Sequence, residues 1–571
     1  MQADRASILW TTSAAGDGKV VVTLPDGGTA EFPAAVRALT PALTQVSSTS
    51  YQYQADLTDL QPGKRYGYRV MQNGVWLTPG PVFFQTAGPG KFSFLVFGDS
   101  GQNTTPQRML VPLMNAEPDI AFLMHTGDLS YPQGTFALYE TNYFGMNAPL
   151  FSRLPVFATP GNHDYLSDGA TAFLACHAGP ACGVDPADAG HYYSFDWGNA
   201  HFTYLDSNLM GTVSRDRMLD WLERDLGATR QFWKIVCLHH PPYPTGHHLG
   251  DSVCNAVRES INPILERYGV QLVLAGHEHG YERTAPLIAD QPVAPGFGTT
   301  YVISGGGGAD LHDVNSGGVT EFALETYHYL RVDVDGSSLT IRATALDGSE
   351  IERTLLRPKP VIPAGGIVST GDFSPSIAAG SLVSIFGDNL APASASATGT
   401  ALPAELGDVR VEFEGKPIPL IYVSPGQVNA EIPYDAPAGG WLELFTANGS
   451  ARAQLSLLPT APSILAVTAN GAIATRANAP SAGAPVVVYA TGLGACRQVA
   501  AGNVTLSQTI TPVDVLFDQW RIHPLFAGLT PGFAGLYQVN FLLPAAVTPG
   551  TYLLRLATPD ALSRLVSVAV Q

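Results

Sequence analysis

The 571-residue chain is poor in charge, and above all in clustered positive charge. Only 14% of its residues are charged, and 30 Lys and Arg against 48 Asp and Glu give a formal net charge of −18. The basic residues are scattered singly, whereas nucleic acids and anionic membranes bind clusters of them. No apolar run approaches the roughly 20 residues that a membrane-spanning helix needs. We therefore expect neither a nucleic-acid partner nor a membrane span.

Cysteine is also scarce, with five residues in the chain. Cys176 and Cys182 flank a short loop of glycine and proline, which predicts a local disulfide. Cys237 and Cys254 offer a second pair, and Cys496 is left over. For these last three residues, free and mostly buried thiols are an equally good interpretation.

A hydrophobic signal sequence is missing between Met1 and the strand-like segment that begins at Ser7. Either the protein is cytosolic or a signal peptide has been removed. Because the C-terminal segments have an extracellular character, we expect removal, and a secreted, periplasmic or cell-surface protein.

Glycine and proline are abundant, with 59 and 44 residues, and 45% of the chain is hydrophobic. This composition is typical of a turn-rich globular protein with many strands, and the length predicts three or four domains. Alternating segments between turn residues predict β-sandwiches near both ends, and residues 57–66 resemble the late strands of a fibronectin type III domain. The expected parts are residues 1–89, a fibronectin III-like sandwich, 90–355, an α/β domain, 356–366, a Pro/Gly linker, and 367–460 and 461–571, two Ig-like sandwiches.

The central part alternates apolar strands with amphipathic helices, which predicts a layered α/β domain. Helices are expected at residues 215–226, between Ser214 and Gly227, and at residues 252–268, before Gly269. The expected strands are 92–97, 120–124, 156–158, 202–205, 233–238 and 271–275.

Five short polar segments each follow directly on one of these strands. Ligands of α/β sheets bind in the crevice beyond the carboxyl ends of the strands, so we expect these segments to converge. Glycine begins four of the five and allows a sharp turn out of the strand. The segments are Gly98-Asp99-Ser100-Gly101, Gly127-Asp128-Leu129-Ser130-Tyr131, Gly161-Asn162-His163-Asp164, Leu238-His239-His240 and Gly276-His277-Glu278-His279.

Together the segments supply two aspartates, one asparagine, three histidines and one tyrosine as candidate metal ligands. One ion takes about four to six ligands, so this set predicts two ions that share a carboxylate. The absence of cysteine argues against a structural zinc site. Structural histidines and turn-forming aspartates are the alternative, which fits any single segment better than all five. The candidates are Asp99, Asp128, Tyr131, Asn162, His239, His277 and His279.

The ordered segments resemble the metallophosphoesterase superfamily, and Tyr131 together with residues 281–283 resembles its purple acid phosphatase branch. The resemblance covers residues from about 7 to 345 and implies a metallophosphoesterase α/β sandwich flanked by β-sandwiches. For Tyr131 the alternative is an aromatic side chain packed beneath the site. The resemblance implies ferric iron held by Asp99, Tyr131 and His279, zinc, manganese or ferrous iron held by Asn162, His239 and His277, and Asp128 as the bridge.

Histidines beside the candidate ligands are expected to handle protons and phosphate. An unperturbed pKa near 6.5 suits His163 to protonate a leaving alkoxide, and Asp164 is expected to orient it. His247 and His248 lie near where the family places its outer phosphate-binding histidines. Which of the two points inward stays open, and exposed loop histidines are the alternative. His240 is expected to be structural.

The resemblance implies hydrolysis of phosphate monoesters by a metal-bound hydroxide that attacks phosphorus in line. Small phosphate esters are therefore the expected partners. One alternative is a phosphodiesterase or nucleotide pyrophosphatase on the same metal frame. Another is a surface-binding protein with a vestigial central domain, against which the presence of all seven candidate ligands argues.

Two segments near the C-terminus, residues 377–387 and 422–430, resemble a bacterial C-terminal domain of undefined function known mostly from Acidobacteria. A Gln-x-Asn pattern at residues 427–429 returns at 538–540, which suggests two related halves. No catalytic constellation is present there. We expect a spacer or a module that contacts a cell surface or matrix, in preference to carbohydrate binding.

Overall fold

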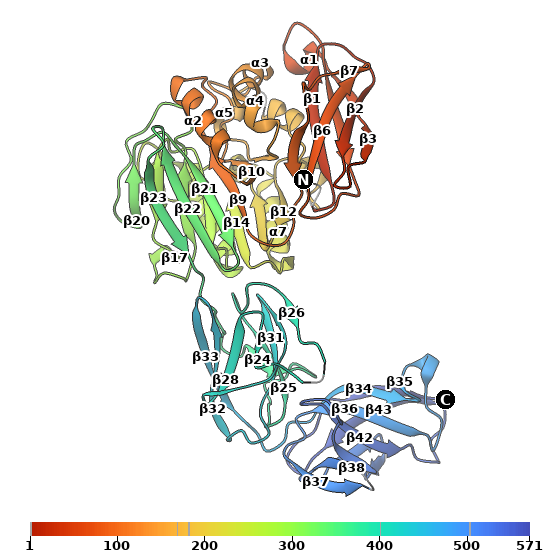
Figure 1. Cartoon of the computed structure of the whole chain (residues 1–571). Helices are drawn as coiled ribbons and strands as arrows, with labels where there is room; N and C mark the ends of the chain where they lie inside the picture. Colours follow the sequence, from red (N-terminus) through yellow and green to blue (C-terminus); the bar gives the residue numbers. More distant parts are fainter. Residues whose placement is uncertain (1–2, 168, 181–182, 400, 502–503) are drawn as a thin grey trace. The chain divides into compact units, whose positions relative to one another are not determined.

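The structure, a computed structural model, describes residues 3–167, 169–180, 183–399, 401–501 and 504–571. It divides into two compact units, Met1–Pro358 and Lys359–Gln571 (Figure 1). The division falls in the proline-rich segment predicted to be a linker. The five-part organisation expected from the sequence is finer than this division and stays a prediction.

The N-terminal residues of the first unit form two small sheets around one apolar core. One sheet has the order β1-β5-β4, and the other has the order β3-β2-β6-β7 with β8 beside β6. Alternation explains the arrangement, because Val20 and Val22 of β2 are buried against Tyr66 and Phe84 while their neighbours are less buried. The bounds are β1 (Ala6–Thr12), β2 (Gly18–Thr23), β3 (Thr29–Pro33), β4 (Ala35–Leu39), α1 (Pro41–Thr44), β5 (Ser50–Leu57), β6 (Arg65–Gln72), β7 (Val75–Trp76) and β8 (Val82–Gln85).

Two larger sheets follow, with the orders β11-β10-β9-β21-β22-β23 and β12-β13-β14-β15-β19-β16-β20. The first consists of β9 (Phe92–Phe97), β10 (Ile120–His125), β11 (Val156–Ala158), β21 (His328–Asp335), β22 (Ser338–Ala345) and β23 (Glu350–Leu356). The second consists of β12 (Tyr193–Trp197), β13 (Ala200–Tyr204), β14 (Trp233–Cys237), β15 (Leu272–Ala275), β16 (Tyr281–Thr284), β19 (Thr300–Ser304) and β20 (Thr320–Leu324). A separate hairpin joins β17 (Leu287–Ile288) to β18 (Gln291–Pro292).

Aromatic side chains fill the space between these two sheets. Phe94 of β9 stacks on Phe122 of β10 with 5.0 Å between ring centroids. Phe202 of β13, in the other sheet, meets Phe94 edge-on at 5.3 Å. Because Leu95 and Phe97 are buried on the opposite face of β9, this strand is apolar throughout rather than alternating.

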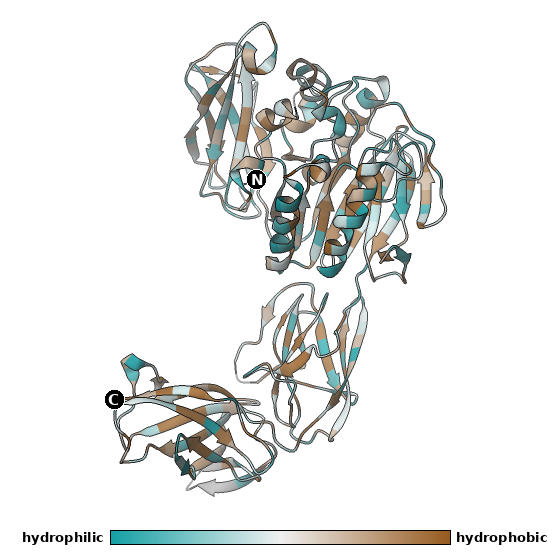
Figure 2. Ribbon diagram, turned by 180° about the vertical axis from the view of Figure 1, so that it is seen from behind, coloured by the Kyte–Doolittle hydropathy of each residue, from teal (hydrophilic) through white to brown (hydrophobic). Residues whose placement is uncertain are grey.

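Helices cover the outer faces of both sheets. The first sheet packs on α2 (Thr105–Ala116) and α4 (Gly145–Phe151), and the second on α7 (Arg215–Ala228), α8 (Ser252–Ser260) and α9 (Asn262–Arg267). Short helices α3 (Phe136–Leu138), α5 (Asn162–Tyr165) and α6 (Thr171–Cys176) lie in the connections. Figure 2 shows hydrophobic residues concentrated along the strands, with hydrophilic residues on the covering helices.

This layered α/β core flanked by β-rich parts confirms the expected fold class. The prediction of one helix over residues 252–268 is wrong, because the structure interrupts it at Ile261 between α8 and α9. Pro263 gives the physical reason, since it has no N–H for the carbonyl of Glu259 and its ring crowds that carbonyl.

The second unit contains four sheets arranged around two cores. One core lies between sheets β24-β25-β31-β30-β26 and β27-β28-β32-β33, and the other between β35-β34-β36-β42-β41-β38-β37 and β40-β39-β43-β44. The repeated Gln-x-Asn pattern lies on β31 in the first pair of sheets and on β42 in the second. The bounds are β24 (Ile367–Ser369), β25 (Leu382–Phe386), β26 (Ala395–Ser396), β27 (Glu405–Leu406), β28 (Val409–Phe413), β29 (Lys416–Pro417), β30 (Leu420–Ser424), β31 (Gln427–Glu431), β32 (Gly439–Thr446), β33 (Gly449–Ser456), β34 (Ser463–Ala469), β35 (Ala472–Ile473), β36 (Pro485–Thr491), β37 (Cys496–Ala501), β38 (Val504–Thr509), β39 (Asp514–Phe517), β40 (Trp520–Ile522), β41 (Phe526–Leu529), β42 (Tyr537–Leu542), β43 (Gly550–Ala557) and β44 (Val566–Val570).

Of the two predicted cysteine pairs, the structure tests the second. Cys237 at the end of β14 and Cys254 in α8 are both buried free thiols, so the suggested second disulfide is wrong. Cys176 and Cys496 are also free thiols, and Cys182, the predicted partner of Cys176, lies outside the described residues. Among the described residues, every helix is too short or too polar to cross a bilayer.

Candidate metal centre

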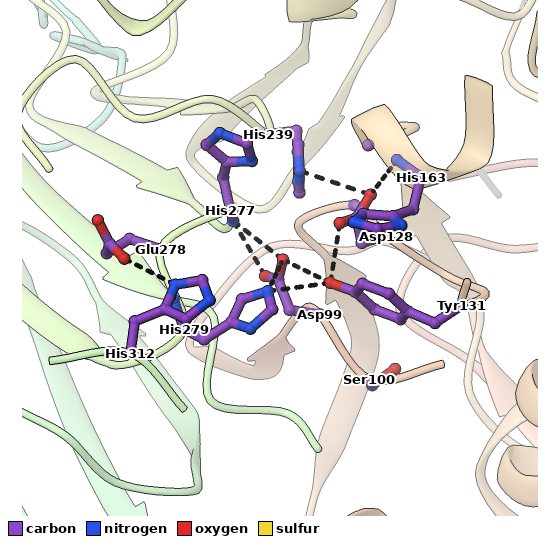
Figure 3. A network of polar contacts seen from close by, with 12 residues as sticks. Asp99, Ser100, Asp128, Tyr131, His163, His239, His277, Glu278, His279 and His312 are labelled. Carbon is purple, nitrogen blue, oxygen red and sulfur yellow. Dashed lines mark hydrogen bonds and ion pairs between the residues drawn. The ribbon is translucent and has the colours of Figure 1, made fainter. Parts of the chain in front are cut away.

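The five polar segments converge at one edge of the paired sheets (Figure 3). Strands β9, β10 and β11 run parallel to one another, as do β14 and β15, so their carboxyl ends deliver the segments together. Asp99 and His277 lie 178 positions apart in sequence, yet the His277 amide donates to both carboxylate oxygens of Asp99 at 3.1 Å. The structure thus brings all seven candidate ligands into one cluster.

Three of the candidate ligands have strained backbones. Asp99, Asp128 and His277 adopt left-handed conformations with φ of 56°, 53° and 70°. Such residues cost on the order of 1–3 kcal/mol each and concentrate at functional sites. The glycines before the ligands serve close packing, since a Cβ at Gly161 would lie 2.1 Å from Asp128 Oδ1 and one at Gly276 would lie 2.4 Å from Asp99 Oδ2.

Around Tyr131, three acceptors compete for one proton. The Tyr131 hydroxyl lies 2.8 Å from Asp128 Oδ2, 3.2 Å from Asp99 Oδ1 and 3.1 Å from His279 Nε2. His279 Nδ1 lies 2.6 Å from the carbonyl oxygen of Asp310, which can only accept, so Nδ1 carries the proton and Nε2 turns a lone pair toward Tyr131.

A second group of potential ligand atoms lies around Asn162 Oδ1. His239 Nδ1 donates to the Thr126 carbonyl at 2.9 Å, which leaves Nε2 unprotonated. That Nε2 lies 2.9 Å from Asn162 Oδ1 and 3.6 Å from Asp128 Oδ1. Asn162 Oδ1 also lies 3.0 Å from His277 Nδ1. His239 Nε2 and Asn162 Oδ1 thus face each other as electron-pair donors.

The excess of lone pairs over protons fits bound cations. Asp99 and Asp128 are 0% and 1% exposed, and no described Lys or Arg forms an ion pair with either carboxylate. Carboxylate oxygens of both residues and a ring nitrogen of His239 lie within 4.8 Å of one another. His277 Nε2 is buried without a hydrogen-bond partner. Oxygen and imidazole donors of this kind suit iron, zinc and manganese.

Burial, and then the charges of Asp128 and Asp99, raise the pKa of the Tyr131 phenol well above its usual value. Without a cation this tyrosine is therefore neutral. A tyrosinate at this position requires a bound ion to compensate its charge.

His163 stands at the open side of the cluster. Its amide donates to Asp128 Oδ1 at 2.8 Å, and its Nδ1 donates to the Pro132 carbonyl at 2.8 Å. The ring packs 4.4 Å from the ring of Tyr131. Nδ1 therefore holds its proton, and Nε2 is the nitrogen that is free to exchange one.

The expectation that Asp164 orients His163 is not what the structure shows. Asp164 accepts from the amides of Gly161 at 2.8 Å and Leu129 at 3.2 Å and from the Tyr139 hydroxyl at 2.8 Å. It faces back into its own turn because the start of α5 needs an acceptor for its free amides. Asp164 thus joins two ligand-bearing segments, and the Pro132 carbonyl orients His163.

The two outer histidines differ in direction. His248 points inward, with its ring stacked at 3.6 Å on that of His277, whereas His247 is exposed. His240 is buried with Nδ1 2.8 Å from Ser207 Oγ, which agrees with a structural role. Burial, then His239 and His248, hold its pKa well below the usual value, so it is uncharged.

Sequence reasoning missed Glu278 and His312. Glu278 is fully buried and lies 2.8 Å from His312 Nδ1, and His312 stacks at 4.0 Å on His279. Burial raises the pKa of Glu278, but contacts with His248 and His312 outweigh it and hold that pKa below its usual value. His312 lies in the loop after β19, which is parallel to β15, but not directly at the end of that strand, so the rule that located the five segments does not reach it.

Comparisons with known proteins agree with this geometry. Residues 92–281 match the family model of the calcineurin-like phosphoesterases. Purple acid phosphatase 21 of Arabidopsis thaliana is 30% identical over 286 residues, which cover 46% of this chain and 62% of that protein. A nucleotide pyrophosphatase/phosphodiesterase of Hordeum vulgare is 29% identical over 287 residues, covering 42% of this chain and 74% of that protein.

A solved structure shares the fold. The purple acid phosphatase PPD1 from yellow lupin (Lupinus luteus) seeds superposes with a TM-score of 0.56 at 18% identity, over 62% of this chain and 72% of that one. The chain spans 62%, 49% and 50% of the lengths of three Arabidopsis thaliana relatives, two of which are named probable inactive purple acid phosphatases. The chain therefore contains a calcineurin-like metallophosphoesterase domain that is similar in sequence to proteins named purple acid phosphatases.

Proposed function

We propose that this protein hydrolyses phosphate monoesters at a pair of metal ions. The observation that carries the proposal is the convergence of seven donor side chains whose lone pairs exceed the available protons. Two buried carboxylates without a Lys or Arg partner among the described residues support it further. A vestigial site would have no reason to keep this arrangement, because each uncompensated buried charge costs several kcal/mol.

The donors divide into two groups by their contacts. Asp99, Tyr131 and His279 surround one position, and Asn162, His239 and His277 surround the other. Asp128 contacts both groups through its two oxygens, as a bridging carboxylate does. A phenolate is a hard anionic donor, so we assign ferric iron to the first position and zinc, manganese or ferrous iron to the second.

A bound metal pair supplies Lewis-acid polarisation of the phosphoryl oxygens and activates water for attack on phosphorus. The protein's own groups handle the remaining protons. His163 holds one proton on Nδ1 through Pro132, so its protonated Nε2 donates to the leaving oxygen. His248 lies against His277 on the other side of the centre, where its ring bounds the space for the phosphoryl group.

The test is metal analysis with a visible absorption spectrum, carried out on the wild type and on Tyr131→Phe. We expect two metals at this centre including iron, and a phenolate-to-iron absorption band that Tyr131→Phe abolishes. Tyr143→Phe is the matched control, since Tyr143 is fully buried and bonds His177 through its hydroxyl rather than a candidate ligand. Iron binding without any such band, or a band unchanged in Tyr131→Phe, contradicts the assignment of Tyr131.

A phosphodiesterase or nucleotide pyrophosphatase activity is the second candidate, favoured by the similarity to the barley protein. Hydrolysis of p-nitrophenyl phosphate against bis-p-nitrophenyl phosphate separates the two. A kcat/KM higher for the bis-ester than for the monoester overturns the monoester assignment and leaves the metal centre in place.

A further inference from the structure

A second cluster of metal-binding side chains lies beside the proposed metal pair, on the far side of His277 and His279 (Figure 3). It consists of His248, Glu278 and His312, whose ligand atoms all lie within 4.8 Å of one another. The rings of His248 and His312 stack on those of His277 and His279 at 3.6 and 4.0 Å. None of these three residues is among the seven donors of the metal pair.

Glu278 is the centre of the cluster. Its side chain is fully buried, and its contacts are the amides of His247 and His248 at 3.1 and 2.9 Å and the two imidazoles. No described Lys or Arg pairs with it. The two imidazoles are therefore its only side-chain partners among the described residues, and a buried carboxylate in such a position is compensated by protonated imidazole or by a bound cation.

The spacing of the donor atoms resembles that around a tetrahedral ion. His248 Nδ1 is buried without a hydrogen-bond partner and lies 3.6 Å from Glu278 Oε1, too far for a hydrogen bond. Ligands about 2.1 Å from a tetrahedral zinc ion lie about 3.4 Å from one another. His312 Nδ1 accepts from the His279 amide at 3.2 Å and lies 2.8 Å from the same Glu278 oxygen, so the pair would open by about 0.6 Å to reach that separation.

Two loops are built closely around this carboxylate. A Cβ at Gly246 would lie 3.1 Å from the Glu278 carboxyl carbon and 2.1 Å from the Asp313 carbonyl. Only glycine therefore lets the loop with His248 pack against both Glu278 and the loop with His312. The three donors are held by backbone packing from three separate segments, as a preorganised site requires.

From this geometry we propose a third cation site, formed by His248 Nδ1, Glu278 and His312 Nδ1. Two imidazoles and one carboxylate are the donors of three-ligand zinc sites, which keep a fourth position open to water. Magnesium and calcium prefer all-oxygen surroundings, so zinc is the ion we assign. The proposal goes beyond the proposed function, because it concerns donors that the metal pair does not use.

The test counts metal ions in the full chain. Wild-type protein is stripped of metal, reloaded with iron and then with zinc at a free concentration fixed by a chelator buffer, and measured by elemental analysis. We expect three metal ions per chain in the wild type and two in His312→Ala, which should keep the phenolate-to-iron band. His247→Ala is the matched control, because this exposed neighbour is not a proposed ligand, and it should keep three ions.

Three results would overturn the proposal. They are two ions in the wild type, three ions in His312→Ala, and loss of the iron band together with the third ion in that variant. Loss of the iron band in His312→Ala would mean that His312 is needed for metal binding at the proposed pair. Glu278→Gln provides a second variant that keeps the side-chain volume, and it too should lose one zinc ion while it keeps the iron band. Lack of phosphatase activity would not affect the comparison, since it rests on the one-ion difference between the wild type and His312→Ala and not on turnover.

Discussion

The stability of the first unit should depend on pH through one buried histidine. His201 on β13 lies between two carboxylates, with Nδ1 2.6 Å from Asp196 Oδ1 and Nε2 2.9 Å from Asp225 Oδ2. Both ring nitrogens donate at once only when the ring is protonated. Asp225 also accepts from Thr203 at 3.0 Å and from Ser194 at 2.6 Å. These two hydrogen bonds hold the Asp225 carboxylate in place as an acceptor for His201.

Burial lowers the pKa of His201, but the bonds to Asp196 and Asp225 outweigh it and raise the pKa from 6.5 to about 9. Each pKa unit corresponds to about 1.4 kcal/mol, which gives an upper figure of about 3 kcal/mol. Water screens the half-exposed Asp196, so we expect about 2 kcal/mol. Because the folded-state pKa is raised, this stabilisation is fully present below pH 6.5 and is lost as the pH rises to about 9.

The assay is urea unfolding at about pH 6, 7.5 and 9.5, which brackets the window from about 6.5 to about 9. Pulse-labelling hydrogen exchange of peptides from β13 and β14 then follows the unfolding of these two strands. The wild type should lose about 2 kcal/mol of its advantage over His201→Gln across this range. His523→Gln is the control, since this histidine is 85% exposed beside Asp514 and should leave the profile of β13 and β14 unchanged. A constant difference between wild type and His201→Gln at all three pH values would refute the reasoning.

Three further predictions concern the site and its scaffold. His163→Ala should slow hydrolysis of alkyl phosphates about 100-fold and of p-nitrophenyl phosphate much less, because only a poor leaving group needs the proton; equal losses in steady-state assays would contradict this role. Phe94→Ala removes one ring from the aromatic core between the sheets and should lower the free energy of unfolding of the first unit by about 3–5 kcal/mol in a urea titration. A loss below about 1 kcal/mol would mean that neighbouring side chains fill the cavity. Truncation after Pro358 should leave kcat/KM for p-nitrophenyl phosphate within about twofold of that of the full chain, since the seven donors all lie in the first unit. A large loss of kcat/KM would mean that residues 359–571 contribute to the site.

The sequence was sufficient for the elements whose signal is local. The strand at residues 92–97 and the helix from residue 215 follow from an apolar period that lies within the segments themselves. The expected boundary signals of that helix are wrong, because Ser214 makes no side-chain cap and Gly227 lies inside α7. The same holds for the convergence of the candidate ligands, since each of their segments follows a strand and parallel strands end at one edge. The single helix expected over residues 252–268 is divided in two, because Pro263 interrupts the backbone hydrogen bonds although the amphipathic period continues around it.

Contacts between distant segments were decided by the tertiary structure alone. The sequence left open which of His247 and His248 points inward, because adjacent loop residues have no periodicity that fixes their direction. Packing of Gly246 against Glu278 decides it in favour of His248. Asp164 was assigned to His163 from their adjacency, but its hydrogen bonds go to its own turn and to Leu129, across 35 positions.

The sequence by itself therefore determined the class of fold and the order of the polar segments that converge at one edge of the sheets. Each of these follows from residue type and local period. The protonation of the ring nitrogens, the orientation of His163 and the cluster around Glu278 depended on carbonyls and side chains from other strands, such as Thr126 for His239 and His312 for Glu278. Hydrogen bonds act over about 3 Å, so only the folded chain specifies which partners lie within reach.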